Sequence, residues 1–241
     1  MPSGDLRWSV YIDIEGFGAL YEREDAVLLA LCDLMEGIFF VGSKCYPESP
    51  ARLFAHQTGD GFIIVSEFGA ASLEVPVALS VALLRHVVRR GRFAKATIAE
   101  GEFSGINGCY HQSVRDAEVD GRVFMGGGLM TLFPIMGTAL INAVALAKRS
   151  PSGALLTLAA SEVGRLPSAC TWQDAGHGVA SIDWVHSQIP LTSTLQREAG
   201  LFAPDAAMIA SAFASYFANS GVKDSWKSNT MSYLGLAAHD L

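Results

Sequence analysis

The feature that most constrains the fold is the triplet Gly59-Asp60-Gly61, which separates two runs with the composition of β-strands. The run 52–58 precedes it, and the run 62–68, dominated by Phe, Ile and Val, follows it. Glycine beside an aspartate suits the positive φ angles of a tight turn. We therefore expect a β-hairpin that carries the Asp60 carboxylate at its tip.

A second carboxylate, Asp13, ends the apolar run 7–13, which we expect to be a strand. Each aspartate alone has an ordinary explanation, since aspartate often ends strands and occupies turns. Together, two carboxylates at neighbouring strand ends can bind a pair of divalent metal ions, the arrangement used for in-line phosphoryl chemistry. The segment after Asp13, residues 14–18, contains two glycines and could present backbone N–H groups to an anion.

The remaining pattern alternates helices with strands. We expect helices over 24–41, 72–90 and 136–149, strands over 93–103, 154–158 and 179–185, and a largely helical segment over 191–219. No element is predicted for 104–132. This order indicates an α+β fold with a central mixed or antiparallel sheet flanked by helices. We expect a domain over 1–190 and, over 191–241, a helical extension packed on it.

Composition limits the classes of partner. The 241 residues are 50% hydrophobic and 17% charged, which favours a large core, and the net charge of −7 argues against a nucleic-acid-binding surface. The uncharged stretch 123–147 is long enough to span a bilayer, but its glycines and Pro134 favour a loop, a strand and a helix. With four scattered cysteines, expected to be buried thiols, and no signal-peptide pattern, we expect a cytoplasmic protein without membrane insertion.

The order of these motifs resembles the catalytic domain of class III nucleotidyl cyclases, the family of adenylate and guanylate cyclases. The resemblance covers roughly residues 7–185, and its first two motifs are specific only in combination. The matching segments are Asp13-Ile14-Glu15-Gly16-Phe17, Gly59-Asp60, Ile98-Ala99-Glu100-Gly101-Glu102, Gly137-Thr138-Ala139-Leu140-Ile141-Asn142-Ala143 and Ser152-Gly153-Ala154-Leu155-Leu156.

The resemblance implies a ferredoxin-like, palm-type sheet and a homodimer in which each active site is shared by two chains. It implies that Asp13, Asp60 and the Ile14 carbonyl bind two Mg²⁺ or Mn²⁺ ions. Residues Ile14, Glu15, Gly16 and Phe17 would then bind the triphosphate of a nucleoside triphosphate. The ribose 3′-oxygen would attack the α-phosphate and release pyrophosphate.

The chain departs from the family where purine-using members read the base and stabilise the transition state. The positions of their helix Asn and Arg hold Ile141 and Ala145, and their base-reading positions hold His56 and Pro134. A cation must replace the missing arginine, and we name four candidates, each of which could equally be a solvated surface charge. They are Arg92, Lys95, Arg115 and Arg122.

Two hypotheses follow from this mixture. The first is an active enzyme with another base, which looks like the pyrimidine cyclases of Pycsar antiphage systems, making cyclic UMP or cyclic CMP for a separate effector protein. An adenylate or guanylate cyclase is the alternative within the same class. The second hypothesis is a catalytically silent, cyclase-like module for dimerisation or nucleotide sensing. A palm-type polymerase or diguanylate cyclase is disfavoured, because the hairpin tip lacks the Gly-Gly-Asp/Glu-Glu-Phe signature.

Overall fold

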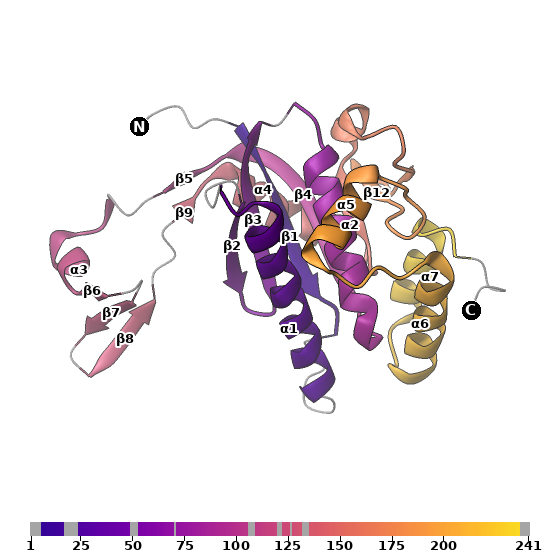
Figure 1. The fold of residues 1–241 in the computed structure, drawn as a ribbon, viewed down its shortest axis with the longest axis horizontal. Helices are drawn as coiled ribbons and strands as arrows, with labels where there is room; N and C mark the ends of the chain where they lie inside the picture. Colours follow the sequence, from indigo (N-terminus) through magenta and orange to yellow (C-terminus); the bar gives the residue numbers. More distant parts are fainter. Residues whose placement is uncertain are drawn as a thin grey trace.

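The computed structural model describes residues 6–16, 24–48, 53–69, 71–105, 109–119, 122–125, 127–131 and 135–236. Figure 1 shows a body built on one large sheet and an arm that projects from it. The sheet has seven strands in the order β11-β12-β10-β4-β1-β3-β2. Helices lie on both of its faces, so the molecule is an α+β protein, as the sequence predicted.

The first half of the body follows a β-α-β-β-α-β order. Its elements are β1 (Leu6–Ile14), α1 (Glu24–Phe40), β2 (Leu53–Thr58), β3 (Gly61–Gly69), α2 (Glu74–Val87) and β4 (Ala94–Glu102). Strand β1 is central and runs antiparallel to both β3 and β4. The spatial order β4-β1-β3-β2 is that of a ferredoxin-like unit.

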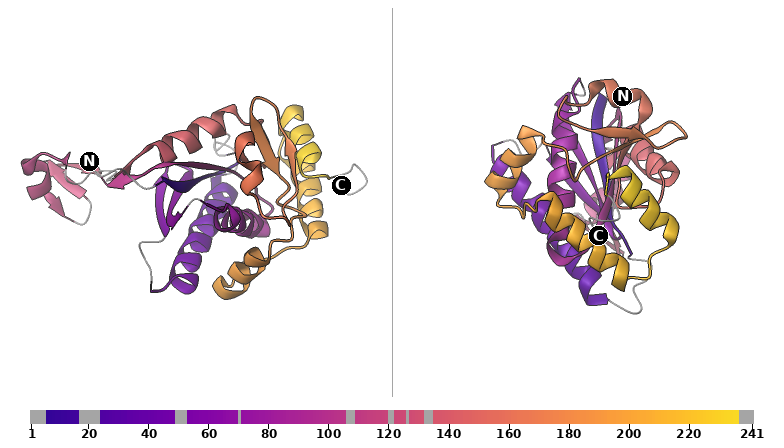
Figure 2. Two further views of the ribbon diagram at one scale, coloured as in Figure 1. Left: turned by 90° about the horizontal axis from the view of Figure 1, so that it is seen from above. Right: turned by 90° about the vertical axis from the view of Figure 1, so that its right-hand side faces the viewer.

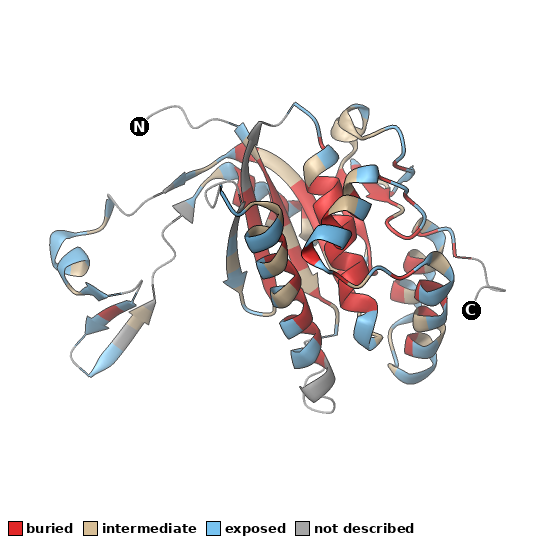
Figure 3. Cartoon of the chain, in the orientation of Figure 1, coloured by how far each residue is buried: buried red, intermediate tan, exposed pale blue. Residues whose placement is uncertain are grey.

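Alternation along β1 explains how the two faces of the sheet are covered. Trp8, Val10, Ile12 and Ile14 are at most 2% exposed and belong to the core that also contains α1 and α2 residues. The opposite face carries Ser9, whose hydroxyl donates to the Ala139 carbonyl (2.7 Å) at the start of α4 (Thr138–Arg149). Tyr11 and Asp13, on the same face as Ser9, are partly buried. Figure 3 shows that the buried residues concentrate in the sheet and the helices packed on it.

The second half extends the sheet and then becomes helical. Strand β10 (Leu156–Ala159) is parallel to β4, and β12 (Val179–Ile182) and β11 (Trp172–Asp174) continue the sheet antiparallel. Helices α5 (Pro190–Ala199), α6 (Ala206–Asn219) and α7 (Asp224–Tyr233) follow, and α6 and α7 lie side by side at one end of the body (Figure 2). Phe213 of α6 stacks on Phe93 with ring centroids 3.8 Å apart, so α6 belongs to the main core.

The arm comprises the residues between β4 and α4. Its base is the pair β5 (Ser104–Gly105) and β9 (Ile135–Met136), and its tip carries α3 (Gln112–Asp116) and the small sheet of β6 (Glu118–Val119), β7 (Arg122–Met125) and β8 (Gly128–Thr131). Figure 1 and the left view of Figure 2 show the tip well away from the body. Within the described part of the arm, Val123 is the buried apolar side chain, whereas Val119, Phe124 and Met125 are more than half exposed.

Several sequence predictions need correction. The third helix begins at Thr138 instead of residue 136, because Ile135 and Met136 pair with β5 as strand β9 and the backbone of Gly137 is extended. The strand from Val179 ends at Ile182, because the Asp183 carboxylate accepts hydrogen bonds from two following amides and forms a turn. The predicted C-terminal helix is broken after α5, where Gly200 adopts a φ of 70°, and α7 was not predicted.

Two expectations about composition can also be checked. The stretch 123–147 contains strands of the arm and most of α4, and no helix in the described residues is long and apolar enough to cross a bilayer. The expectation of buried thiols is wrong for Cys32 and Cys109, which are exposed, whereas Cys170 is buried. Cys32 lies on the exposed face of α1, and the sequence pattern did not distinguish this face from the buried face of the helix.

Candidate active site

Strand pairing brings the two predicted carboxylates together. Asp13, near the end of β1, pairs with Gly61, the first residue of β3, and the Ile14 amide donates to the Asp60 carbonyl (3.4 Å). The turn between β2 and β3 is formed by Gly59, with a φ of 67°, and Asp60. Asp60 therefore lies beside Asp13, and the two side chains share a hydrogen bond.

The electrostatics of this pair are unfavourable without a cation. The pKa of Asp13 is raised to about 7, first by burial and then by the charge of Asp60 and the hydrogen bond that they share. Lys95 only partly opposes this rise. The pKa of Tyr11, two residues earlier on the same face of β1, is raised to about 12 by burial and by both aspartates. An excess of negative potential in a partly buried site favours binding of a cation.

The donor groups fit a hard divalent cation. Asp13 Oδ1 is buried and has no hydrogen-bond partner among the described residues. Space beside it exists because residue 61 is glycine: a Cβ there would lie 2.9 Å from Asp13 Oδ1 and 2.5 Å from the Ile12 carbonyl oxygen. The described residues contain no cluster of three or more His, Cys, Asp or Glu side chains suited to a metal. Two carboxylates, with backbone carbonyl and phosphate oxygens completing the shell, suit Mg²⁺ or Mn²⁺.

The turn after Asp13 is tightly attached to the rest of the body. The Glu15 amide donates to the Phe93 carbonyl (2.9 Å), and Gly16 adopts a φ of 89°, which a residue with a Cβ rarely adopts. The Glu15 carboxylate accepts a hydrogen bond from Trp226 Nε1 (2.8 Å), and burial raises its pKa. Phe17, the last residue of the expected triphosphate segment, lies outside the described residues.

Lys95 has a structural position. It pairs with Asp13 across β1 and β4, and its ammonium group donates to the carbonyls of Ala147 (3.2 Å), Ser150 (3.4 Å) and Pro151 (3.0 Å) at the C-terminal end of α4. Burial lowers its pKa, and the charges of Glu15 and Asp13 oppose that shift. All three ammonium protons therefore have acceptors, so Lys95 positions α4 against the carboxylate end of β1.

The other three candidate cations occupy two different regions. Arg92 is partly buried beside the turn, with its guanidinium carbon 5.7 Å from the Tyr216 ring centroid. Arg115 and Arg122 are exposed on the arm, where Arg115 donates to Gln112 (2.7 Å). Because the arm projects away from the body, the structure does not bring either of them to Asp13 and Asp60 of the same chain (Figure 1).

The structure describes one of the two expected base-reading residues, His56. His56 lies on the edge strand β2, opposite Ile63 of β3, and burial lowers its pKa, so that the imidazole is neutral near pH 7. It is therefore on the same hairpin as Asp60. Pro134 lies outside the described residues.

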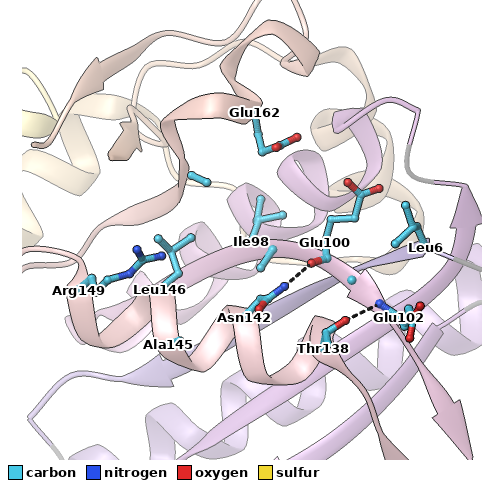
Figure 4. A pocket seen from close by; sticks show the side chains of 13 residues that line it. Leu6, Ile98, Glu100, Glu102, Thr138, Asn142, Ala145, Leu146, Arg149 and Glu162 are labelled. Carbon is cyan, nitrogen blue, oxygen red and sulfur yellow. Dashed lines mark hydrogen bonds between the residues drawn. The ribbon is translucent and has the colours of Figure 1, made fainter. Parts of the chain in front are cut away.

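A cavity of about 660 Å³ lies between β4 and α4 (Figure 4), and neither Asp13 nor Asp60 lines it. Asn142 and Thr138 border it and are fixed to β4 by hydrogen bonds to the Glu100 carbonyl (2.9 Å) and from the Glu102 amide (2.8 Å). Its lining includes Ala145 and Arg149, whereas Ile141 is 65% exposed and does not line it. The lining also includes Leu6, which is seven residues from Asp13, or roughly 20 Å along β1.

Sequence reasoning missed three residues that shape the site. Trp226 and Tyr216, from α7 and α6, contact the Glu15–Gly16 turn, but the sequence pattern indicated only helix packing for this segment. Arg149 ends α4 and lines the cavity, and a cation at a helix C-terminus gives no signal beyond its favourable interaction with the helix dipole.

Comparison with known proteins gives limited results. No family profile matches the chain, and no curated protein matches it. Among solved structures, the guanylyl cyclase Cya2 is similar at 10% identity with a TM-score of 0.45, over 78% of this chain and 96% of that chain. The adenylyl cyclase CyaB from P. aeruginosa is similar at 10% identity with a TM-score of 0.46, over 73% of this chain and 93% of that chain. The guanylyl cyclase domain of the RhoGC fusion protein from the aquatic fungus Blastocladiella emersonii is similar at 8% identity with a TM-score of 0.46. The match covers 74% of this chain and 96% of that chain. Likenesses of this size leave the activity to be judged from the residues of the site.

Proposed function

We propose that the chain is a nucleotidyl cyclase of the class III type, which converts a nucleoside triphosphate to the 3′,5′-cyclic nucleotide and pyrophosphate. The observation that carries the proposal is that Asp13 and Asp60 lie beside each other at the ends of neighbouring strands. Asp13 Oδ1 is buried without a hydrogen-bond partner among the described residues, and the pKa of this carboxyl is raised to about 7. A binding site of this kind is completed by divalent cations and a polyanionic substrate.

The reaction forms a bond between the ribose 3′-oxygen and the α-phosphorus and breaks the bond between the α-phosphorus and the bridging oxygen of pyrophosphate. Asp13, Asp60 and the Ile14 carbonyl would hold two Mg²⁺ or Mn²⁺ ions. When bound, these ions supply activation of the 3′-hydroxyl and neutralisation of the triphosphate charge. Because the Glu15 amide already donates to the Phe93 carbonyl, the Gly16 amide is the donor of this turn that would bind the triphosphate, with Phe17 as the expected continuation. Lys95 keeps α4 against this end of the sheet.

A homodimer with shared sites is part of the proposal. The cavity between β4 and α4 begins at the far end of β1 from Asp13, so the two features of one chain do not form one site. The arm exposes Val119, Phe124 and Met125, which a second copy would cover. In such a dimer Arg115 and Arg122 on the arm would come from the partner chain, whereas Arg92 would come from the chain that supplies Asp13.

The proposed substrate is UTP, or else CTP, and the proposed role is second-messenger synthesis in the cytoplasm during antiphage defence, with a separate effector that senses the product. The support is the chemistry of α4, where Ile141 and Ala145 can form no side-chain hydrogen bond to a phosphate or a base. A purine cyclase of the resembling family would have Asn and Arg there. Adenylate or guanylate cyclase activity remains the alternative, followed by a silent module that binds nucleotides without cyclising them.

The test is incubation of purified protein with Mn²⁺ and each of the four ribonucleoside triphosphates, followed by mass spectrometry of the products. We expect cyclic UMP or cyclic CMP, no product from Asp60→Ala, and normal product from Asp174→Ala, a matched change on the exposed strand β11. Cyclic AMP or cyclic GMP as main product would overturn the pyrimidine assignment. Nucleotide binding without any product would favour the silent module.

A further inference from the structure

The C-terminal helices α6 and α7 contact the turn that follows Asp13. Trp226 of α7 is 6% exposed, and its indole N–H donates to Glu15 Oε2 at 2.8 Å. The two residues are separated by 211 positions in the chain. A hydrogen bond between a partly buried carboxylate and a buried indole fixes both groups, because neither has bulk water as an easy replacement partner.

Tyr216 of α6 makes the second contact. Its hydroxyl oxygen would lie 3.3 Å from a Cβ on Gly16, so the phenol occupies the space directly beside the turn. The Tyr216 ring also lies 5.6 Å from Trp226 and 5.2 Å, edge on, from Phe93. Since the Phe93 carbonyl accepts the Glu15 amide, the same aromatic cluster holds the turn through its backbone and through the Glu15 side chain.

The aromatic cluster of Phe93, Tyr216 and Trp226 also contacts a cation, Arg92. The Arg92 guanidinium lies over the Tyr216 ring, at 5.7 Å from its centroid, a cation–π geometry. Burial raises the pKa of Tyr216, and the charge of Arg92 opposes that rise. Arg92 therefore lies next to the residue that touches Gly16, on the same side of the body as the expected triphosphate segment.

Packing alone does not account for this arrangement. The Glu15 carboxylate is partly buried, and removing a carboxylate from water costs free energy. An apolar residue at position 15 would fill the same space without that cost. The carboxylate does, however, give Trp226 an acceptor, and this hydrogen bond determines where the backbone of residues 15 and 16 lies.

We propose that Trp226 and Tyr216 are positioning residues for the triphosphate: they hold the Glu15–Gly16 turn in its phosphate-binding conformation and keep Arg92 beside it. This inference rests on the proposed function. It makes the C-terminal helices a working part of the active site, and it assigns Arg92 to the triphosphate of the chain that also supplies Asp13 and Asp60.

The experiment compares Trp226→Phe with Trp184→Phe. Both changes keep an aromatic ring and remove one buried indole hydrogen bond, since Trp184 Nε1 donates to the Ala154 carbonyl (2.7 Å) and not to a residue of the turn. Hydrogen exchange of the Glu15 and Gly16 amides reports the turn directly. Calorimetry with Mg²⁺ and tripolyphosphate reports phosphate binding without any turnover, and steady-state kinetics with the preferred nucleotide separate KM from kcat.

For Trp226→Phe we expect at least tenfold faster exchange of the Glu15 amide and about fivefold to tenfold weaker tripolyphosphate binding, the usual net effect of one hydrogen bond. KM should rise by a similar factor while kcat changes less than twofold. Trp184→Phe should lower the melting temperature without these effects. Glu15→Ala combined with Trp226→Phe should be no worse than Glu15→Ala alone, because both changes remove the same interaction.

Equal behaviour of the two tryptophan variants would overturn the inference, as would absence of tripolyphosphate binding by the unaltered protein. If the unaltered protein binds tripolyphosphate and Trp226→Phe weakens that binding, but no nucleotide is cyclised, the proposed function fails while the positioning role stands. If cyclisation occurs and KM is unchanged in Trp226→Phe, the positioning role fails and the proposed function stands.

Discussion

The body buries most of its apolar side chains, whereas in the described part of the arm Val123 is buried and Val119, Phe124 and Met125 are more than half exposed. Four alternate residues of β1 are at most 2% exposed, whereas Phe124 on β7 is 57% exposed and Met125 is 55% exposed. A three-stranded sheet without a core of its own is marginally stable in water. The body therefore satisfies its own side chains, and the arm presents a surface that needs a partner. In our proposal that partner is a second copy of the chain.

The largest effect is expected from the carboxylates in the body. Asp60→Ala should lower cyclase activity by about 10³-fold or more, because a bound metal ion contributes several kcal/mol of charge stabilisation in the transition state. The same variant should remain dimeric and folded by light scattering and circular dichroism. Retained activity in a folded Asp60→Ala protein would show that the reaction does not need the Asp60 carboxylate and would contradict the two-metal site.

The arm should show the opposite behaviour. Phe124→Asp places a charge on the exposed apolar surface of β7, so we expect monomers by light scattering and a loss of activity of roughly 10²-fold, with little change in the melting temperature of the body. Glu118→Asp, also on the arm, is the control because it leaves the apolar surface intact. A dimeric Phe124→Asp protein with normal activity would show that the arm does not form the interface.

Mixing experiments sharpen the comparison further. If sites are shared, Asp60→Ala chains mixed with Arg122→Ala chains should regain activity, because one site of each mixed dimer has both an intact body and an intact arm. About one quarter of all sites is then complete, since random pairing gives half mixed dimers with one good site each. No recovery after subunit exchange would place Arg122 outside the shared site.

A smaller effect is expected at Gly61. Gly61→Ala brings a Cβ to 2.5 Å from the Ile12 carbonyl oxygen and 2.9 Å from Asp13 Oδ1, so β1 and β3 must separate. We expect a loss of about 1–3 kcal/mol in the free energy of unfolding and weaker Mn²⁺ binding by calorimetry. Gly59→Ala, where the added Cβ meets nothing within 4 Å, should cost stability through its φ of 67° and leave Asp13 in place.

The smallest effect concerns pH. Because the Asp13 pKa is about 7 in the folded protein and near 4 in the unfolded chain, the folded state binds more protons between these values. The stability of the metal-free protein should therefore fall as pH rises from 4 to 7. In EDTA at pH 8, Asp13→Asn should be more stable by about 1 kcal/mol after allowance for solvent screening, or ~2–4 °C in melting temperature. Mn²⁺ should make the unaltered protein more stable than Asp13→Asn. If the relative stability of the two proteins is the same with and without Mn²⁺, the prediction of an electrostatically unfavourable Asp13–Asp60 pair is wrong.

The parts that sequence predicted well depend on short-range chemistry. The hairpin at Asp60 follows from its glycines, and the strand ending at Asp13 follows from an apolar run, so their bounds agree with β1, β2 and β3 to within about two residues. Their adjacency was an inference from the family resemblance. It is explained by the register, which pairs Asp13 with Gly61.

The rest depends on long-range contacts that leave no local pattern. The strands of the arm have two to four residues each and are too short for a period to be recognised. Lys95 looked like a candidate cation, but three carbonyls at the end of α4 occupy it. No role was predicted for Trp226, and nothing in the sequence around either residue indicates that Trp226 donates to Glu15.

The bond between Glu15 and Trp226 also has a consequence for biosynthesis. Glu15 is synthesised 211 residues before its partner Trp226 on α7, an interval of roughly 10–40 s at elongation rates of about 5–20 residues per second. During that interval the nascent chain has its carboxylates but not the helix that secures the turn behind them. Chains that end before α7 should therefore bind tripolyphosphate more weakly than chains with α7, because the Glu15–Gly16 turn lacks its contact with Trp226.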